Sequence, residues 1–218
     1  MLIEIVSDAI CPWCFVGKRR LERALAMARP PDLKIGWRPF QLNPDMPPDG
    51  MDRKEYLRLK FGDGAGGQMY TALSEAGQGE GIGFAFDKIK RTPNTILAHR
   101  LIRYSADLAQ QDAVVEALFR AYFLAGADIG RVDTLVGVCE QLGLDGPSIR
   151  RYLESDEDVE TVRAEDAYAR QIGIQGVPCF IIERKFAISG AQAPEVFVQA
   201  FEHVREEAAR APQPAVQE

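Results

Sequence analysis

The sequence predicts an α/β fold in which the two halves of one small sheet are separated along the chain by a long helical insertion. Three patterns indicate this: strand, helix and strand before residue 45, helical periodicity over most of 46–155, and two short β-prone runs with a helix near the C-terminal end. We therefore expect residues 1–45 and 156–210 to form one sheet unit. Residues 46–155 are expected to be an all-helical domain, and 211–218 a disordered tail.

The first part of the chain has the pattern of a strand, a helix and a second strand. Residues 2–6 (LIEIV) form a short β-prone run, and from about Pro12 apolar side chains recur every three to four residues, as in a helix. Pro30-Pro31 ends that helix, because proline cannot donate the backbone hydrogen bond that a helix needs. The run 33–42 is then expected to be a second strand, interrupted late by Pro39.

The remaining elements are predicted from the same signals. A segment rich in Pro, Asp and Gly opens the insertion, whose helices are expected to begin near residues 53, 68, 94, 112, 132 and 147. A further amphipathic helix covers about 157–172 and ends at Gly173. Two β-prone runs separated by Arg184-Lys185 predict a hairpin, and Pro194 opens a last helix that continues to about residue 210.

Composition and charge exclude several classes of function. The chain has 218 residues, is 46% hydrophobic and carries a net charge of −6, so it can bury a large core but offers no positive field for nucleic acid. Its one compact basic run, Lys18 to Arg20, is interpreted as the solvated face of a helix. The N-terminus lacks the features of a secretory signal, and no window has the roughly 18 apolar residues of a membrane span. We therefore expect a soluble cytoplasmic protein without membrane or nucleic-acid partners.

The four cysteines are Cys11, Cys14, Cys139 and Cys179, too few and too unevenly spaced for a disulfide framework. In a reducing compartment, a CxxC pair such as Cys11-Pro12-Trp13-Cys14 is more often catalytic or metal-binding. A zinc site needs further ligands, and the chain has no second CxxC and no histidine pair to supply them. We therefore expect a redox dithiol and no metal, with two merely buried cysteines as the alternative.

The predicted position of the dithiol at a helix start suggests a role for each sulfur. The first amide groups of a helix have no partner within it, and the helix dipole adds positive charge there, so a thiolate is favoured at Cys11. Cys11 is therefore the expected attacking sulfur. Cys14 lies one turn further along and is more shielded, which suits the thiol that resolves a mixed disulfide.

A second motif, Gly176-Val177-Pro178, directly precedes the first β-prone run of the hairpin. A cis bond before Pro178 would leave the backbone of Val177 free to pair with a substrate peptide, whereas an ordinary trans proline is the alternative. Trp13 is expected to offer an exposed aromatic surface. We assign substrate binding to Pro12, Trp13, Val177 and Pro178.

The order of these elements and motifs resembles the DsbA-like branch of the thioredoxin superfamily over nearly the whole chain. A set of shorter motifs is similar to the FrnE-type cytoplasmic subgroup. The set comprises Ser7-Asp8 before the CPWC motif, Gly17 after it, Trp37-Arg38-Pro39-Phe40, Asn94-Thr95 with His99, and Ile188-Ser189-Gly190-Ala191. Together these motifs are specific, although each alone is weak.

The resemblance implies a thioredoxin fold with an inserted helical domain, in which Cys11 attacks, Cys14 resolves and Pro178 is a cis proline facing them. The sequence departs from the family in two places. Thioredoxins often bury an acid six residues before the first cysteine, where this chain has Ile5, so another proton acceptor is required and Asp8 is the candidate. The Pro-Trp pair lacks the histidine that stabilises the thiolate in strongly oxidising periplasmic members, which predicts a less oxidising couple.

Two further side chains are auxiliary candidates. His99 is singled out by the family pattern alone, since a single helical histidine is usually structural. Cys179 follows Pro178, so it either brings a third sulfur toward the dithiol or points into the core as a small apolar residue, as is also expected of Cys139 and Trp37. A disulfide between Cys179 and the attacking cysteine would be the sign of a regulatory role.

These observations predict a thiol–disulfide oxidoreductase that acts on disulfide-containing proteins or small thiols, requires no bound cofactor and can use glutathione as a redox partner. The direction of electron flow and the oligomeric state stay open, with a homodimer among the alternatives. The main rival is a glutathione-linked isomerase or transferase, similar to kappa-class transferases and hydroxychromene-carboxylate isomerases, which typically have a serine in place of Cys11. The third hypothesis is a non-catalytic thioredoxin-like binding module, which an intact CxxC disfavours.

Overall fold

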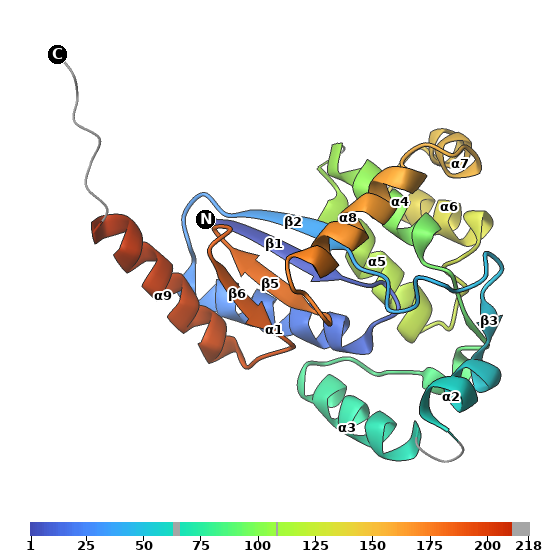
Figure 1. The fold of residues 1–218 in the computed structure, drawn as a ribbon, viewed down its shortest axis with the longest axis horizontal. Coiled ribbons are helices and arrows are strands. Elements are labelled where there is room, and N and C mark those ends of the chain that lie inside the picture. The colour runs from blue at the N-terminus through green and yellow to red at the C-terminus, as the bar shows by residue number, and fades with distance from the viewer. Residues whose placement is uncertain (63–65, 108, 211–218) are drawn as a thin grey trace.

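The structure, a computed structural model, describes residues 1–62, 66–107 and 109–210, so the predicted disordered tail at 211–218 lies outside the described residues. Its main sheet has the strand order β2-β1-β5-β6 (Figure 1). The first strand, β1 (Leu2–Ser7), runs parallel to β2 (Lys34–Pro39) and antiparallel to β5 (Cys179–Ile182). The hairpin partner of β5 is β6 (Phe186–Ser189). The predicted α/β fold with a helical insertion is therefore confirmed.

One face of the sheet is covered by the first and last helices, α1 (Pro12–Ala28) and α9 (Pro194–Arg210), which pack against each other. Alternation along β1 directs Ile3 and Ile5 to this face, since successive side chains of a strand point to opposite sides. Phe180 of β5 joins them, with its ring edge-on to Phe197 at 4.8 Å between centroids. All four side chains are at most 1% exposed, so this layer is the main core of the sheet unit.

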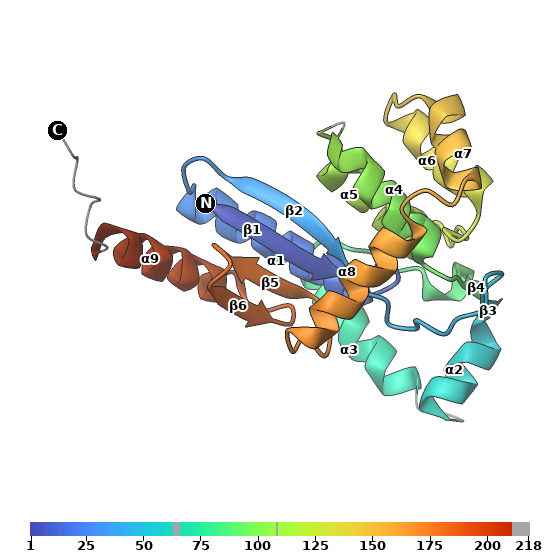
Figure 2. The same ribbon diagram turned by 45° about the horizontal axis from the view of Figure 1, so that its top comes forward.

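On the opposite face of the sheet, α8 (Val159–Gln171) lies at the end where β1 and β2 finish (Figure 2). A small buried cluster lies beneath it, formed by Val6, Phe40, Ala169 and Cys179. Val6 and Cys179 are directly opposed in the antiparallel pairing of β1 with β5, so their side chains share this face. The two faces of the sheet therefore have separate apolar clusters.

The insertion contains α2 (Arg53–Phe61), α3 (Gly66–Gly79), α4 (Ile96–Asp107), α5 (Gln111–Phe123), α6 (Val132–Gln141) and α7 (Gly146–Glu154). It is not all-helical as expected, because a two-stranded ladder joins β3 (Met51–Asp52) to β4 (Arg91–Thr92), and a 3₁₀ turn lies at Phe86–Lys88. Gly50, just before β3, allows the chain to come close enough to β4 for this pairing. Its φ of +70° suits glycine, and a Cβ there would lie 2.6 Å from the carbonyl oxygen of Thr92.

A cluster of phenylalanine rings attaches α1 to the insertion. Phe15, in the first turns of α1, stacks on Phe119 of α5 at 5.1 Å between centroids and meets Phe84 edge-on at 6.2 Å. Phe123 lies against the same group. Because these rings come from segments about 70 to 110 positions apart, the helix that begins at the dithiol is held by the insertion as well as by the sheet.

The basic run Lys18 to Arg20 is not the solvated face that we expected. Lys18 is 3% exposed, and its Nζ contacts carboxylates of Glu22, Asp112 and Glu116. Burial favours the neutral amine, but the bond to Glu22 and the nearby carboxylates outweigh it and raise the pKa of Lys18. The prediction was wrong because the acids that surround this lysine come mostly from α5, which only the tertiary fold brings to α1.

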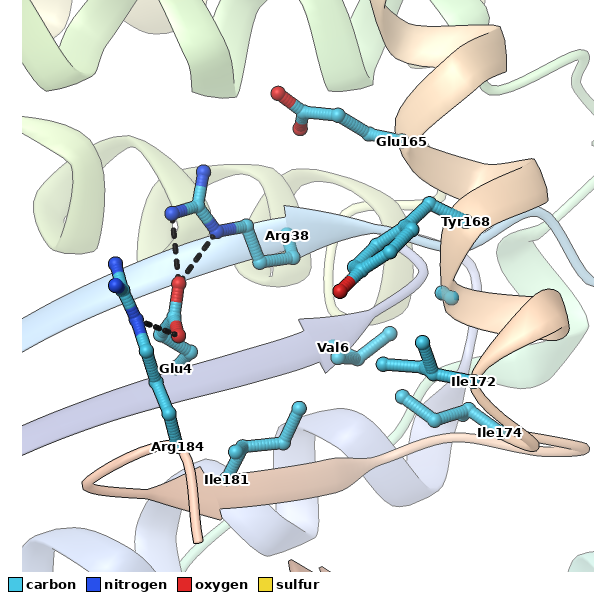
Figure 3. Close-up of a pocket in the computed structure, with 10 residues that line it drawn as sticks. Glu4, Val6, Arg38, Glu165, Tyr168, Ile172, Ile174, Ile181 and Arg184 are labelled. Carbon is cyan, nitrogen blue, oxygen red and sulfur yellow. Dashed lines mark hydrogen bonds and ion pairs between the residues drawn. The ribbon is translucent and has the colours of Figure 1, made fainter.

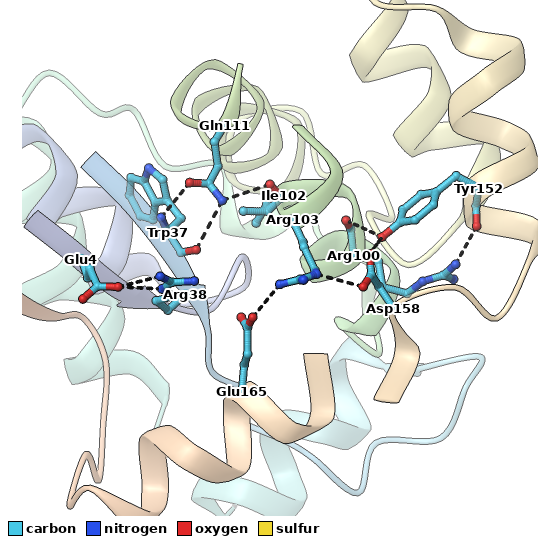
Figure 4. Close-up of polar contacts among 10 residues, drawn as sticks. All are labelled: Glu4, Trp37, Arg38, Arg100, Ile102, Arg103, Gln111, Tyr152, Asp158 and Glu165. Carbon is cyan, nitrogen blue, oxygen red and sulfur yellow. Dashed lines mark hydrogen bonds and ion pairs between the residues drawn. The ribbon is translucent and has the colours of Figure 1, made fainter. Parts of the chain in front are cut away.

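The outer strand β2 is closed by a side chain rather than by another strand. Gln111 accepts the backbone amide of Trp37 at 2.8 Å and donates its own amide to the carbonyl of Trp37 at 3.3 Å (Figure 4). The same amide nitrogen reaches the carbonyl of Ile102 in α4 at 3.2 Å. Trp37 is 4% exposed, which confirms that it belongs to the core. The side chain of Gln111 thus pairs the sheet edge as a neighbouring strand would.

Replacing Gln111 with alanine is expected to lower the free energy of unfolding by about 1–3 kcal/mol, because the edge amide and carbonyl of Trp37 lose their partner in a buried place. Urea denaturation followed by circular dichroism measures this. Gln110→Ala is the matched control, since Gln110 forms no side-chain capping bond at the start of α5. An equal loss in both variants would mean that the pairing with β2 is unimportant.

A second buried polar side chain, Arg100 of α4, binds the connection between α7 and α8. The arginine is 1% exposed, and its guanidinium donates four hydrogen bonds to backbone carbonyls, drawn in part in Figure 4. The acceptors are Glu157 at 2.6 Å, Tyr152 at 2.6 Å, Ser155 at 2.9 Å and Leu153 at 3.1 Å. Two of these carbonyls belong to the last turn of α7 and two lie beyond it, so the arginine joins the end of that helix to the connection that follows.

Candidate active site

The candidate site lies where β1 ends and α1 begins. Ser7 is the last residue of β1, and a turn brings the amide of Cys11 to 3.0 Å from the carbonyl of Asp8. Cys11 is the N-cap of α1, with φ −91° and ψ 111°, and Pro12 is the first helical residue. This is the predicted arrangement, because proline at that position removes an amide that would have no partner in the helix.

The two sulfurs of the CPWC motif are both free thiols and both buried. Cys11 is 4% exposed and Cys14, one turn into α1, is 1% exposed. Burial raises the pKa of Cys14 well above its ordinary value, and the hydrogen bond and negative charge of Cys11 raise it further. Bonds from the hydroxyl of Ser7 and the backbone of Asp8 act in the opposite direction. Cys14 is therefore held as a neutral thiol that can donate to Cys11.

The Gly176-Val177-Pro178 motif lies directly across from Cys11. The bond between Val177 and Pro178 is cis, and the Sγ of Cys11 donates to the carbonyl of Val177 at 3.5 Å. Gly17 of α1 permits this close approach. A Cβ at Gly17 would lie 3.0 Å from both Pro178 and the ring of Phe180, so the helix could not pack as tightly against β5 with any other residue.

The residues assigned to substrate binding differ in how far they are exposed. Pro12, Trp13 and Val177 are half-buried, while Pro178 is buried beneath them. Trp13 packs partly against the main core instead of standing free. Its ring therefore offers less surface to a partner than the sequence suggested, but it is positioned by its packing beside the attacking sulfur.

Asp8 lies fully buried directly behind the motif. Its carboxylate accepts the amide of Leu42 at 2.8 Å and that of Ile10 at 3.4 Å. The Nε2 of His99, from α4, is 3.4 Å from the same carboxylate, and His99 is itself 3% exposed. That nitrogen has no hydrogen bond of good geometry among the described residues. The structure thus brings together two auxiliary candidates that lie 91 positions apart in the sequence.

Cys179 belongs to a different part of the molecule from the dithiol. Its side chain is 5% exposed and lies in the cluster beneath α8, on the face of the sheet opposite α1. Cys14, in contrast, belongs to the core that α1 covers. The β5 backbone therefore separates the third sulfur from the motif, although only Pro178 lies between Cys179 and the cis bond in sequence.

Oxidation of the protein is expected to join Cys11 only to Cys14 and to leave Cys179 a free thiol, because the sheet lies between them. Peptide mass spectrometry after treatment with oxidised glutathione measures the pairing. Cys139 is the internal reference, since it is 0% exposed within α6 as expected of a core residue, and burial raises its pKa to about 11. Detection of a Cys11–Cys179 peptide would contradict this placement.

Sequence reasoning named Ser7 and Val177 within motifs, but it did not predict the contacts that they and Leu42 make with the site residues. The hydroxyl of Ser7, the amide of Leu42 and the carbonyl of Val177 all contact site residues. Backbone groups carry no residue-type signal, so only the fold shows them. Over the described ranges, His, Cys, Asp and Glu form no group of three arranged to hold a metal ion. Nor does any described helix combine the length and apolar character needed to cross a membrane.

This strand, helix and cis-proline arrangement is that of a thioredoxin-type dithiol site, and comparison with known families agrees. Residues 2–202 match the DSBA-like thioredoxin domain. The chain therefore belongs to the DSBA-like thioredoxin domain family.

The relatives extend over nearly the whole chain. The crystal structure of the probable DsbA oxidoreductase SCO1869 from Streptomyces coelicolor is 30% identical, with a TM-score of 0.88, and the match covers 100% of this chain and 94% of that one. The uncharacterized protein YwbO from Bacillus subtilis is 29% identical over 91% of this chain and 94% of its own length. The cytosolic disulfide reductase DsbM from Pseudomonas aeruginosa, solved with GSH, shares the fold at 16% identity and a TM-score of 0.66, covering 97% of this chain and 100% of its own.

Proposed function

We propose that this protein is a thiol–disulfide oxidoreductase that exchanges disulfides through Cys11 and Cys14. The observation that carries the proposal is the position of Cys11: it caps α1, contacts Cys14, and has its sulfur 3.5 Å from the carbonyl before the cis proline. The helix start stabilises negative charge on an attacking sulfur, and the half-buried backbone at Val177 suits an extended substrate. Membership of the DSBA-like family supports the same reaction class.

The reaction proceeds by two exchanges. The thiolate of Cys11 attacks one sulfur of a substrate disulfide, so that a Cys11–substrate bond forms and the other substrate sulfur leaves as a thiolate. Cys14 then gives up its proton and attacks Cys11, which releases the second substrate thiolate and leaves a Cys11–Cys14 disulfide. The substrate gains two electrons and the protein loses two. Two thiols of glutathione return the protein to the dithiol and become glutathione disulfide.

The second exchange requires a proton acceptor, because burial holds Cys14 as a neutral thiol. We assign this role to Asp8, whose carboxylate is held by the amides of Leu42 and Ile10 and lies 3.4 Å from the Nε2 of His99. Asp8 is fully buried and its backbone contacts Cys14, whereas the position that often holds the buried acid in thioredoxins is occupied by Ile5. The carboxylate takes the proton as Cys14 attacks and passes it back in the reverse exchange.

Asp8→Asn is expected to slow resolution of the mixed disulfide by about tenfold to a hundredfold, and to shift its optimum to higher pH, because hydroxide then has to remove the Cys14 proton. Stopped-flow kinetics of a preformed mixed disulfide with glutathione measure this step. Asp166→Asn is the control, since Asp166 is another buried carboxylate that accepts a backbone amide, that of Gln41 at 2.7 Å. A normal pH profile in Asp8→Asn would remove Asp8 from this role.

Glutathione is the proposed small-thiol partner and the cytoplasm the proposed compartment. The DsbM structure with GSH, which shares the fold, is described as a cytosolic disulfide reductase. Disulfide-containing proteins and small disulfides are both proposed as substrates. The rival glutathione-linked isomerase does not need a second cysteine, so glutathione-dependent isomerisation that survives Cys14→Ser would support it. Failure to cycle between dithiol and disulfide would support the binding-module alternative.

A redox titration tests the proposed function directly. In buffers of oxidised and reduced glutathione, the protein is expected to show one two-electron transition with a potential more negative than the about −120 mV of DsbA, since no histidine separates the cysteines. Fluorescence of Trp13, inside the motif, reports the transition. The absence of a transition at any glutathione ratio would overturn the proposal.

A further inference from the structure

A cavity of about 460 Å³ lies on the second face of the sheet, where no part of the reaction takes place (Figure 3). Its floor is formed by Val6 and Ile181, and one wall is formed by Tyr168 of α8 and by Ile172, which directly follows that helix. This volume falls within the range of about 300–1,000 Å³ that is typical of small-molecule sites. The dithiol begins α1, which covers the opposite face, so this is a separate site.

The cavity exists because α8 covers only part of this face. Tyr168 is 62% exposed and Ile172 is 49% exposed, although both face an apolar floor. Ile174 and Ile181 are only half-buried beside them. Apolar area left in water costs about 25 cal/mol per Å², so a ligand that covers these side chains gains free energy.

The rim of the cavity carries two arginines and two glutamates, Arg38, Arg184, Glu4 and Glu165. Arg38 donates Nη2 and Nε to one oxygen of Glu4, at 2.7 and 2.9 Å, and Arg184 donates Nε to the other oxygen at 3.3 Å (Figure 3). Two guanidinium groups therefore share one carboxylate. Their side chains are 46% and 72% exposed, which leaves donor capacity for a ligand.

The other acid at the rim, Glu165, has a partner outside the lining. It accepts a hydrogen bond from Arg103 at 2.6 Å, and the same guanidinium also pairs with Asp158, so the charges around the rim balance as a whole (Figure 4). The donors of Arg38 and Arg184 are nevertheless shared by a single carboxylate, that of Glu4, and stay exposed beside the apolar floor. A neutral apolar molecule would use only the floor, whereas an anion would also bind these donors.

We propose that this cavity binds a small amphipathic anion, with its apolar body against Val6, Ile174 and Ile181 and its carboxylate or sulfonate at Arg38 and Arg184. Guanidinium groups bind such anions with charge-assisted hydrogen bonds. A second copy of the chain would present a broad surface, whereas this site combines a recessed apolar floor with two exposed guanidinium groups. Occupancy of the cavity is independent of the dithiol reaction.

Binding is measured with 1-anilinonaphthalene-8-sulfonate, an aromatic anion whose fluorescence rises in apolar surroundings, and with octanoate as its competitor. The probe is expected to bind, octanoate to displace it, and 1-octanol to compete at least about fivefold more weakly because it lacks the charge. Octanoate added to the wild-type protein is also expected to shift amide resonances at residues 168–184. This last measurement requires no variant.

Two variants and their matched controls locate the site. Ile172→Glu is expected to weaken probe binding at least about tenfold, since it places a charge in the apolar wall, whereas Leu59→Glu, at a 60% exposed apolar residue elsewhere, leaves it within about twofold. Arg184→Ala is expected to weaken octanoate about fivefold and 1-octanol hardly at all, while Arg151→Ala on α7 changes neither.

Three outcomes would overturn the proposal. They are sensitivity of the probe to Leu59→Glu instead of Ile172→Glu, equal binding of octanoate and 1-octanol, and resonance shifts confined to other segments. A dimer in sedimentation experiments that Ile172→Glu converts to a monomer, without anion binding, would show that the face is a subunit interface. Circular dichroism of each variant establishes that it is folded, and an unchanged glutathione titration shows that the dithiol is intact.

Discussion

Replacing Cys11 with serine is expected to lower the rate of disulfide reduction at least about a thousandfold, because a hydroxyl cannot form the mixed disulfide that begins the exchange. The structure supports a specific loss and not a folding defect. Cys11 caps α1 without a side-chain capping bond, so serine fits the same backbone. Reduction of insulin by the protein with glutathione measures the rate.

Two further variants, Cys14→Ser and Cys139→Ser, test whether the loss of activity is specific to the attacking sulfur of Cys11. Cys14→Ser retains the attacking sulfur but cannot resolve, so it is expected to accumulate a mixed disulfide visible by mass spectrometry. Cys139 is a buried free cysteine of α6, and its serine variant is expected to keep the wild-type rate while losing some stability. Activity of Cys11→Ser equal to that of Cys139→Ser would place the chemistry elsewhere.

Replacing Arg100 with methionine is expected to have the largest effect on stability, a loss of about 3–5 kcal/mol in the free energy of unfolding. Four carbonyls at and beyond the end of α7 would lose a charged donor that lies 1% exposed, and water has no access to replace it. Methionine retains most of the apolar stem, so the variant tests the hydrogen bonds more than the packing. Urea denaturation at neutral pH measures the loss.

Arg103, one turn further along α4, is the matched control. Its guanidinium pairs with Asp158 at 2.9 Å and Glu165 at 2.6 Å, but its side chain is 39% exposed (Figure 4). Arg103→Met is expected to cost less than about 1 kcal/mol, since exposed ion pairs contribute little. If Arg103→Met destabilised the protein as much as Arg100→Met, charge and not carbonyl pairing would be the important factor.

Local sequence signals predicted most of the elements. Proline and glycine are strong markers because each restricts or permits particular backbone angles, and the helix after Pro12, the hairpin turn at Arg184-Lys185 and the helix after Pro194 all occur where expected. The β3–β4 ladder was missed, since two-residue strands have no periodicity to detect. Lys18 was misjudged because its partners on α5 are about 100 positions away.

The candidate site could be predicted where its reactive residues lie within one short segment of the sequence. Cys11 and Cys14 are three positions apart and need only the start of one helix, so the sequence alone indicates a dithiol at a helix start. Pro178 and the cis bond before it were expected from a motif and from the family, and the fold places Val177 against Cys11.

The sequence by itself determined an α/β fold with a helical insertion and a dithiol at the start of its first helix. Helix and strand propensities and the CxxC spacing are properties of a few neighbouring residues, so they can be read from one segment. Only the tertiary structure decided which groups surround that dithiol. It joined Asp8 to His99, directed Cys179 to the other face of the sheet, and left an open cavity beside α8. Contacts across the sheet depend on strand order and on side-chain alternation between two faces, and neither can be read from one segment alone.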